Sequence, residues 1–164
     1  MHLLVKNNFL HTKTKVFRCS IGKNGLTRNK TEGDLCTPIG EFKFERIFYR
    51  EDKIKEINFL LRSDVISKND GWCDDPNSKF YNQHIKFPFN ESAEQLYRSD
   101  DLYDLICVIN YNTNPILHGK GSAIFLHIAK PHFESTEGCV AISKEDLITL
   151  VQQIDAHSTI TISN

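Results

Sequence analysis

The hydrophobic pattern along the chain is mainly that of a β protein. Residues 41–49 (EFKFERIFY) alternate partly between polar and apolar positions and follow a Thr-Pro-Ile-Gly turn signal. Residues 105–109 (LICVI) and 122–129 (SAIFLHIA) are short apolar runs, which are typical of strands buried on both faces. Two further strand-like segments, 16–21 (VFRCSI) and 158–163 (STITIS), lie toward the two ends of the chain. These segments predict a sheet assembled from several short strands.

One segment near the end of the chain has the period of a helix. Ser143 is a good N-cap for a helix over residues 144–154, and two acidic residues follow it in the first turn. Apolar residues then recur at helical spacing, at Leu147, Leu150, Val151 and Ile154. By contrast, residues 63–94 show no regular period and are rich in turn formers, so we expect a long irregular stretch there, which is often functional. The pattern as a whole predicts a mainly β domain with one or a few short helices.

Length and charge narrow the possible functions. The 164 residues contain no repeat and no flexible linker, so we expect a single domain over residues 1–164. The formal net charge of −1 argues against a nucleic-acid partner. No apolar run reaches the ~18 residues that a membrane span requires. The apolar segment near the start, His-Leu-Leu-Val, is too short for a secretory signal, so the sequence shows no export address.

The cysteine pattern does not suggest a disulfide framework or a zinc site. The five cysteines are odd in number, and no pair has the C-x-x-C spacing: Cys19, Cys36, Cys73, Cys107 and Cys139. We therefore expect no metal and no cofactor. An odd set of this kind is typical of mostly buried free thiols, and it is compatible with one of them being a reactive thiolate.

The stretch FLHIAKPHFESTEGCVAIS, residues 125–143, carries the strongest chemical signal. A cysteine nucleophile needs an accessible thiolate, a base within reach, and N–H donors for the oxyanion. Gly138 allows a sharp turn before Cys139, whose surrounding N–H groups would form an oxyanion hole. His127 lies on the preceding predicted strand, and the loop 130–137 would return the chain beside it. The structural alternative is a buried cysteine and a satisfied core histidine.

These residues resemble the active-site motif of the L,D-transpeptidase catalytic domain (YkuD-like) family, which is a histidine, a spacer, and then Ser/Thr-His-Gly-Cys. His127 and the segment 136–139 match this motif. The resemblance runs from about Arg18 to the C-terminus. Its other motifs, in chain order, are residues 30–34 (KTEGD), 37–42 (TPIGEF), 71–76 (GWCDDP) with 81–82 (YN), and 102–105 (LYDL).

The resemblance implies a mainly β catalytic domain, sandwich- or barrel-like, that acts on peptidoglycan stem peptides. Cys139 would be the nucleophile, His127 its base, and the N–H groups of Gly138 and Cys139 the oxyanion donors. The thiol would attack the carbonyl of the third stem residue and release the terminal D-alanine. An amine of a second stem would then take the acyl group and complete a 3–3 cross-link. Carbapenem-type inhibitors, which present a strained β-lactam carbonyl, would be captured by the same thiol.

Other functions remain open at this point. Within the same chemistry, an L,D-carboxypeptidase or amidase would let water replace the acceptor amine. A non-catalytic cell-wall binding module would keep the fold without turnover, and a thiol redox protein lacks a resolving cysteine close in sequence. The resemblance implies the periplasm or cell wall, whereas the lack of a visible leader leaves the cytoplasm open. The oligomeric state is not indicated.

Two positions depart from the family pattern. Glu137 occupies the place of the family's histidine before Gly-Cys, and a carboxylate there is expected to raise the pKa of Cys139. Ala141 stands where the family often has asparagine or arginine, which affects the expected substrate contacts. His118 and His132 flank the motif, and His132 is the alternative base. We expect His127 to be the base because a strand holds it more rigidly than a loop would.

Further candidates line the expected substrate groove. The candidate groove residues are Trp72, Asp74, Asp75, Tyr81, Asn82 and Thr136. For the irregular segment around residues 72–82, the alternative is a loop held by Asx turns and a buried tryptophan. A charged turn could also contact the stem peptide, although a solvated turn is the preferred interpretation for its members Arg28, Lys30, Glu32 and Asp34.

Overall fold

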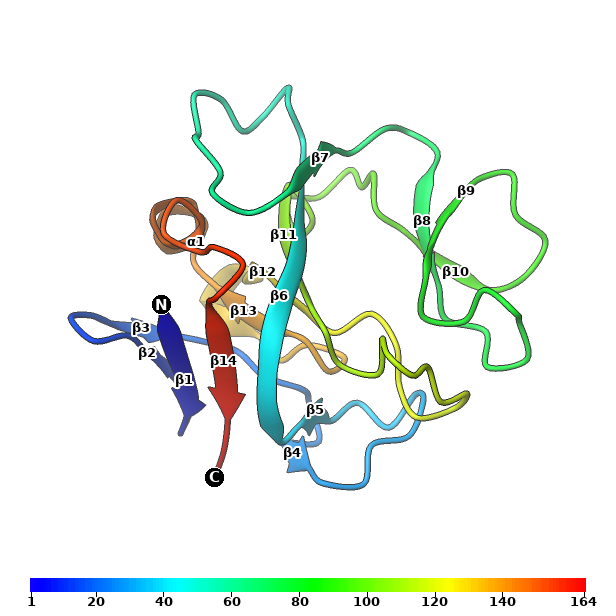
Figure 1. The fold of residues 1–164 in the computed structure, drawn as a ribbon, viewed down its shortest axis with the longest axis horizontal. Coiled ribbons are helices and arrows are strands. Elements are labelled where there is room, and N and C mark those ends of the chain that lie inside the picture. The colour runs from blue at the N-terminus through cyan, green and yellow to red at the C-terminus, as the bar shows by residue number, and fades with distance from the viewer.

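A nine-stranded sheet forms the body of the molecule in the computed structural model, which describes all residues 1–164 (Figure 1). Its spatial order is β13 (Val140–Ile142), β12 (Phe125–Ile128), β11 (Leu105–Ile109), β6 (Gly40–Tyr49), β14 (Thr159–Ile162), β1 (His2–Lys6), β2 (Phe9–His11) and β3 (Val16–Arg18), with β7 (Ser63–Val65) paired to β6. Just beyond β3, Ser20 forms an antiparallel bridge with Ala141 of β13. This bridge joins the two ends of the sheet, which makes it a nearly closed barrel.

Smaller elements surround the barrel. They are the three-stranded sheet β10 (Ala93–Gln95), β8 (Asp70–Cys73) and β9 (His84–Lys86), the short pair β4 (Leu26–Thr27) and β5 (Thr37–Pro38), the helix α1 (Lys144–Val151) and the 3₁₀ turn η1 (Pro131–Phe133). Figure 1 shows the three-stranded sheet set apart from α1, on the other side of β6 and β11. None of the helices has both the length and the apolar character needed to cross a membrane. The mainly β prediction is thus confirmed, with one α-helix and one 3₁₀ turn.

The best-predicted elements are those with a clear local pattern. Strand β11 has the predicted bounds, and β6 begins one residue before the predicted segment 41–49. Helix α1 begins at Lys144, and the Ser143 side chain accepts a hydrogen bond from the Asp146 N–H at 3.2 Å, as expected of an N-cap. The helix ends at Val151, three residues earlier than predicted. Ile154 is nevertheless fully buried, so its apolar character reflects packing after the helix has ended.

Other elements differ from the prediction for identifiable reasons. Strand β12 is shorter than residues 122–129 because Ala123 has a positive φ of 52°, which interrupts extended backbone. The stretch 63–94 was expected to be irregular, and this is wrong in part, since β7, β8 and β9 lie within it. All four residues of β8 are buried, so the strand shows no alternation. Strand β1 was not predicted; it pairs in parallel with β14 from the far end of the chain.

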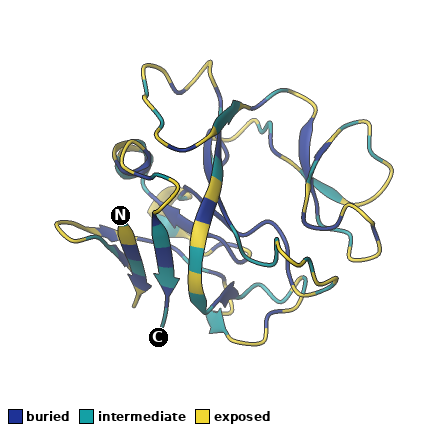
Figure 2. Ribbon diagram, viewed as in Figure 1, coloured by how far each residue is buried: buried dark blue, intermediate teal, exposed yellow.

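Both faces of β11 and β12 are covered, since every residue of these two strands is buried, whereas Figure 2 shows exposed positions along β6. Along β12, Leu126 and Ile128 enter the larger hydrophobic cluster, which includes the apolar face of α1. Phe125 points to the other face and packs in a smaller cluster with Trp72 and Cys139. Successive strand residues point to opposite faces, so two covered faces produce the continuous apolar runs seen in the sequence. The smaller cluster is the one that carries the candidate site.

Candidate active site

Two neighbouring parallel strands place Cys139 and His127. Strand β12 pairs with β13, with His127 opposite Ala141. Cys139 is two residues before Ala141, and residues two apart in extended chain share a face of the sheet. The thiol and the imidazole therefore lie on the same face of the sheet, and both line one pocket. The register between β12 and β13 brings His127 and Cys139 together, and the loop that connects the strands contains η1. In the sequence these two residues were linked only by their spacing.

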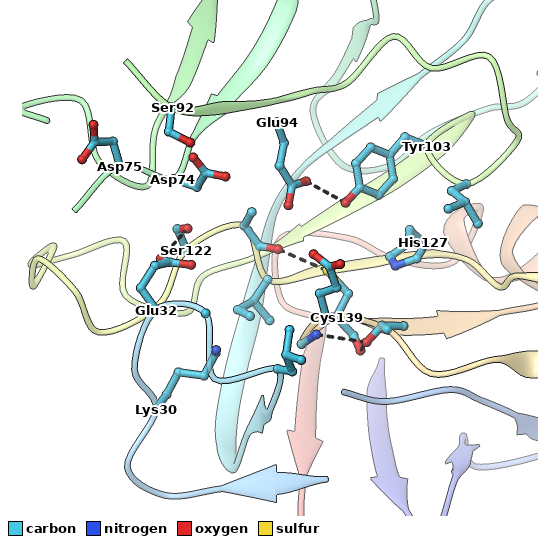
Figure 3. A pocket seen from close by; sticks show the side chains of 18 of the residues that line it. Lys30, Glu32, Asp74, Asp75, Ser92, Glu94, Tyr103, Ser122, His127 and Cys139 are labelled. Carbon is cyan, nitrogen blue, oxygen red and sulfur yellow. Dashed lines mark hydrogen bonds between the residues drawn. The ribbon is translucent and has the colours of Figure 1, made fainter. Parts of the chain in front are cut away.

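The pocket has a volume of about 670 Å³, which is in the range of small-ligand sites (Figure 3). Charged side chains dominate its wall. Its carboxylates are Glu32, Asp74, Asp75, Glu94 and Glu137, and its cations are Lys30, Arg98 and Lys130. A site with both signs of charge suits a ligand that itself carries both, such as a peptide with free amine and carboxylate groups.

The Cys139 thiol is buried and protonated at rest. The residue is 8% exposed, and its Sγ lies 3.2 Å from the Ala123 carbonyl oxygen, to which it donates. The Phe125 N–H donates to the sulfur at 3.4 Å. Burial raises the pKa of the thiol to about 12, and the charge of Glu94 adds to this effect. No hydrogen bond joins Sγ to His127 here, so the thiol proton has to turn from Ala123 before a base can take it.

The His127 imidazole is neutral and has a defined tautomer. The residue is 5% exposed, and Nδ1 lies 2.8 Å from the Ile128 carbonyl oxygen. A carbonyl only accepts, so Nδ1 carries the hydrogen and Nε2 is the ring's proton acceptor. Burial lowers the pKa of the imidazole to about 4, against the opposing effect of the Ile128 carbonyl. The ring of Tyr103 packs edge-on against it, with centroids 5.3 Å apart. A neutral, oriented imidazole is the form that can act as a base.

The two other histidines near the motif lie outside the pocket. His132 is exposed in η1, with a positive φ of 59°. His118 is also exposed, and its ring stacks on Tyr81 at a centroid distance of 5.4 Å. Neither side chain lines the pocket. The preference for His127 over His132 is consistent with this placement.

The turn before Cys139 is held by threonine hydroxyls. Gly138 has a φ of 141°, and a Cβ at this position would lie 3.0 Å from the Cys36 carbonyl oxygen, so glycine is required. Thr136 Oγ1 donates to the Cys139 carbonyl at 2.7 Å and accepts from the Gly138 N–H at 3.1 Å. The Gly138 N–H expected in the oxyanion hole is therefore already engaged. The Cys139 N–H donates to no protein group and remains open to a ligand oxygen.

The expected groove residues divide into two groups. Asp74 and Asp75 line the pocket, as does Thr136. Trp72, Tyr81 and Asn82 are buried and do not line it. Asn82 Oδ1 accepts from the Trp72 indole N–H and from the Ala123 N–H, both at 3.0 Å. These contacts agree with the alternative interpretation of residues 72–82, a loop with a buried tryptophan. They form a buried network that holds the segment preceding β12.

The charged turn at residues 28–34 is only partly solvated. Arg28 is exposed and outside the pocket, but Lys30 is 6% exposed and lines it. The solvated-turn interpretation is thus wrong for Lys30. Its charge can be buried because Asp34 pairs with it, with 2.5 Å between Nζ and Oδ1.

Glu94 is a site residue that was not predicted from the sequence. It lies on β10 in the small sheet, and its carboxylate accepts a hydrogen bond from the Tyr103 hydroxyl at 2.8 Å (Figure 3). Burial raises the pKa of this carboxyl. The segment AEQ has no pattern that would single it out, and only the folded chain brings it to the thiol. Tyr103 had a signal, because it lies in the LYDL motif, although no role followed from that.

Removing the Glu94 charge is expected to make Cys139 more reactive. The charges of Glu94 and Glu137 both raise the pKa of the thiol, and Glu94 has the larger effect. We expect Glu94→Gln to increase the rate of Cys139 alkylation by iodoacetamide at pH 8 to 9 severalfold, because removing the charge lowers the pKa of the thiol. At a pH below the pKa, each unit by which the pKa falls raises the thiolate fraction tenfold. Peptide mass spectrometry would assign the modified cysteine. Glu137→Gln is the matched control and should give a smaller increase; the opposite order would contradict this electrostatic account.

Comparison with known proteins identifies the family. The model of the family described as "YkuD: L,D-transpeptidase catalytic domain" matches residues 3–162. Among solved structures, one match is the crystal structure of Mycobacterium tuberculosis L,D-transpeptidase 1, with 10% sequence identity and a TM-score of 0.44. This match covers 99% of the chain and 58% of the M. tuberculosis chain. A search of curated proteins found no match. Because the family model spans nearly the whole chain, the protein belongs to the family of L,D-transpeptidase catalytic domains.

Proposed function

We propose that the protein is a cysteine-dependent L,D-transpeptidase that acts on peptidoglycan stem peptides. The observation that carries the proposal is the placement of His127 on β12 and of Cys139 immediately before the adjacent parallel strand β13, both lining one pocket in a member of this family. The family supports peptidoglycan peptides as the substrate class, and the proposal therefore includes the cell wall as the site of action. The pocket's mixture of carboxylates and cations suits the charged ends and side chains of stem peptides.

The first half of the reaction forms an acyl-enzyme. His127 Nε2 takes the thiol proton while Cys139 Sγ attacks the carbonyl carbon of the third stem residue. The carbonyl oxygen becomes an oxyanion, toward which the open Cys139 N–H can donate. When the tetrahedral intermediate collapses, the C–N bond breaks and His127 returns the proton to the leaving amine. Terminal D-alanine departs, and a thioester remains on Cys139.

The neutral resting state shapes this step. With a thiol pKa of about 12 and an imidazole pKa of about 4, a stable thiolate–imidazolium pair does not form before substrate binds. Proton transfer from the thiol therefore accompanies attack. The groups that stabilise the developing charge then contribute more to lowering the activation barrier. A protonated thiol in the resting enzyme is also less exposed to oxidation than a thiolate would be.

The second half transfers the acyl group. The amine of a second stem attacks the thioester carbonyl, His127 accepts the amine proton, and the C–S bond breaks as the new amide forms. The departing sulfur regains a proton from His127. The product is a cross-link between the third residues of two stems. The same thioester would release a free tripeptide if water attacked in place of the amine.

Product analysis tests the proposal directly. The protein is incubated with a disaccharide-tetrapeptide, and the products are examined by mass spectrometry. A cross-linked dimer that has lost one D-alanine supports transpeptidation. A tripeptide alone would replace the proposal with an L,D-carboxypeptidase. If the wild-type protein yields no more product than Cys139→Ser does, the result contradicts the proposed reaction and favours a binding role.

Covalent capture by a carbapenem is the second test. The thiol should open the strained β-lactam: the Sγ–C bond forms, the ring C–N bond breaks, and the ring nitrogen takes the proton. Intact-mass measurement should show the mass of one added drug molecule on the wild-type protein. Cys139→Ser should show none. A wild-type protein that stays unmodified at long times and high drug concentration would contradict the proposed acylation chemistry.

A further inference from the structure

The Lys30 side chain is a buried cation with one hydrogen-bond donor unused. Its Nζ lies 2.5 Å from Asp34 Oδ1 and 3.2 Å from the Thr31 carbonyl oxygen. An ammonium has three N–H donors, and the third has no protein acceptor. The side chain is 4% exposed and lines the pocket, so the third donor is available to a ligand that enters there. An unused charged donor in a buried position indicates a negatively charged partner that arrives with the ligand.

Two glycines allow the Lys30 stem to reach the turn that precedes the thiol. A Cβ on Gly121 would lie 2.8 Å from Lys30 Cγ, so any larger residue there would displace the stem. A Cβ on Gly138 would lie 3.7 Å from Lys30 Cε, which sets the end of the side chain against the Gly138–Cys139 turn. Figure 3 shows Lys30 reaching from its loop toward the side of the pocket where Cys139 lies.

The oxyanion site lacks a second backbone donor. The Gly138 N–H donates to Thr136 Oγ1 at 3.1 Å, which leaves the Cys139 N–H alone. We propose that the Lys30 ammonium supplies the missing donor and binds the oxyanion formed from the attacked carbonyl. This inference rests on the proposed acylation of Cys139. Asp34 holds the ammonium in place through two further bonds of its own, accepting from the Thr31 N–H at 2.9 Å and the Cys36 N–H at 2.8 Å.

The charges around the thiol explain why a cation is needed there. Groups that face the thiol or its base come from several elements. They are Glu94 on β10, Arg98 after β10, Tyr103 before β11, His127 on β12, Lys130 after β12, Glu137 before β13, and Lys30 with its partner Asp34. Arg98 is paired with Asp100 at 2.6 Å, and its guanidinium lies over the Tyr103 ring at 5.2 Å from the ring centroid. Among these groups, the charge of Lys30 lowers the pKa of Cys139, whereas those of Glu94 and Glu137 raise it.

The electron balance of the step is simple. Attack forms the Sγ–C bond and moves the carbonyl π electrons onto oxygen, while the thiol proton passes to His127. Lys30 keeps its own proton throughout and donates a hydrogen bond to the oxyanion. When the C–N bond breaks, the carbonyl re-forms and the donor is released.

The test uses opposite substitutions in one ion pair. Lys30→Met should slow carbapenem acylation by about 10²- to 10³-fold, the usual effect of losing one oxyanion donor, and should lower the rate of Cys139 alkylation by iodoacetamide at pH 8 to 9. Asp34→Asn should raise that alkylation rate, because it leaves the ammonium unneutralised. Lys23→Met, an exposed lysine outside the pocket, is the matched control and should behave as the wild type. Thermal unfolding of each variant would measure any loss of stability.

The outcomes separate this inference from the proposed function. A general loss of stability would change the alkylation rate in the same direction in both variants of the ion pair, and that result would overturn the inference. If Lys30→Met does not fold, an unchanged or lowered alkylation rate in Asp34→Asn would overturn it as well. Wild-type protein that is not acylated would contradict the proposed function instead. Normal acylation in both wild type and Lys30→Met would refute only the role of Lys30.

Discussion

Replacing Cys139 with serine is expected to reduce carbapenem acylation and stem-peptide turnover to the uncatalysed background. The base beside it is a buried imidazole with a pKa of about 4. Such a weak base is poorly matched to a hydroxyl, which is far harder to deprotonate than a thiol. Serine is close to cysteine in size, so the small hydrophobic cluster around it should remain packed. Intact-mass spectra and product analysis would measure the loss, and circular dichroism would check the fold.

The buried cysteines of the larger cluster are the matched controls. Cys107→Ser and Cys19→Ser each place a hydroxyl in an apolar site, which costs about 1–3 kcal/mol of unfolding free energy when the hydroxyl has no partner. Neither residue lines the pocket, so activity per folded molecule should be retained. Near-normal turnover in Cys139→Ser, or loss of turnover in the folded controls, would show that the nucleophile was assigned wrongly.

His127→Ala is expected to lower the acylation rate by about 10²- to 10⁴-fold, the usual contribution of a positioned general base. The pH profile supplies a second check. Burial lowers the pKa of His127 to about 4, so the imidazole is neutral and able to accept a proton above this value. The acid limb of the wild-type rate profile should therefore lie near pH 4, below the ordinary histidine range, and should be absent in His127→Ala.

His132→Ala distinguishes between the two candidate bases. His132 is exposed in η1 and does not line the pocket, so its removal should change the rate little. A large loss in His132→Ala with a small one in His127→Ala would exchange their roles. An alanine at position 127 also leaves a cavity beside Tyr103, and unfolding measurements would separate this effect from loss of the base.

The positive-φ residues before β12 show where local pattern stops being sufficient. Apolar character over residues 122–129 predicts one strand, yet Ala123 has left-handed backbone and its N–H is held by Asn82. A side chain from a distant loop thus decides where the strand begins. Strand β11 was predicted with its correct bounds because its five apolar residues are bounded by polar ones on both sides.

The sequence by itself determined the elements with strong local signals and the spacing of the candidate pair. The cap at Ser143, the helical period after it, the partial alternation of β6 and the apolar run of β11 depend on neighbours within a few residues. The motif around His127 and Cys139 also lies within one short segment, so a strand, a loop and a turn suffice to join them.

Only the tertiary structure decided the electrostatics of the site. Glu94, Tyr103 and Lys30 come from separate segments and meet Cys139 through packing of the small sheet and the 28–34 turn against the barrel. The engagement of the Gly138 N–H by Thr136 and the neutral states of thiol and imidazole follow from this packing as well. The physical reason is that burial and charge act through space: a pKa depends on which groups lie within a few ångströms, whatever their separation along the chain.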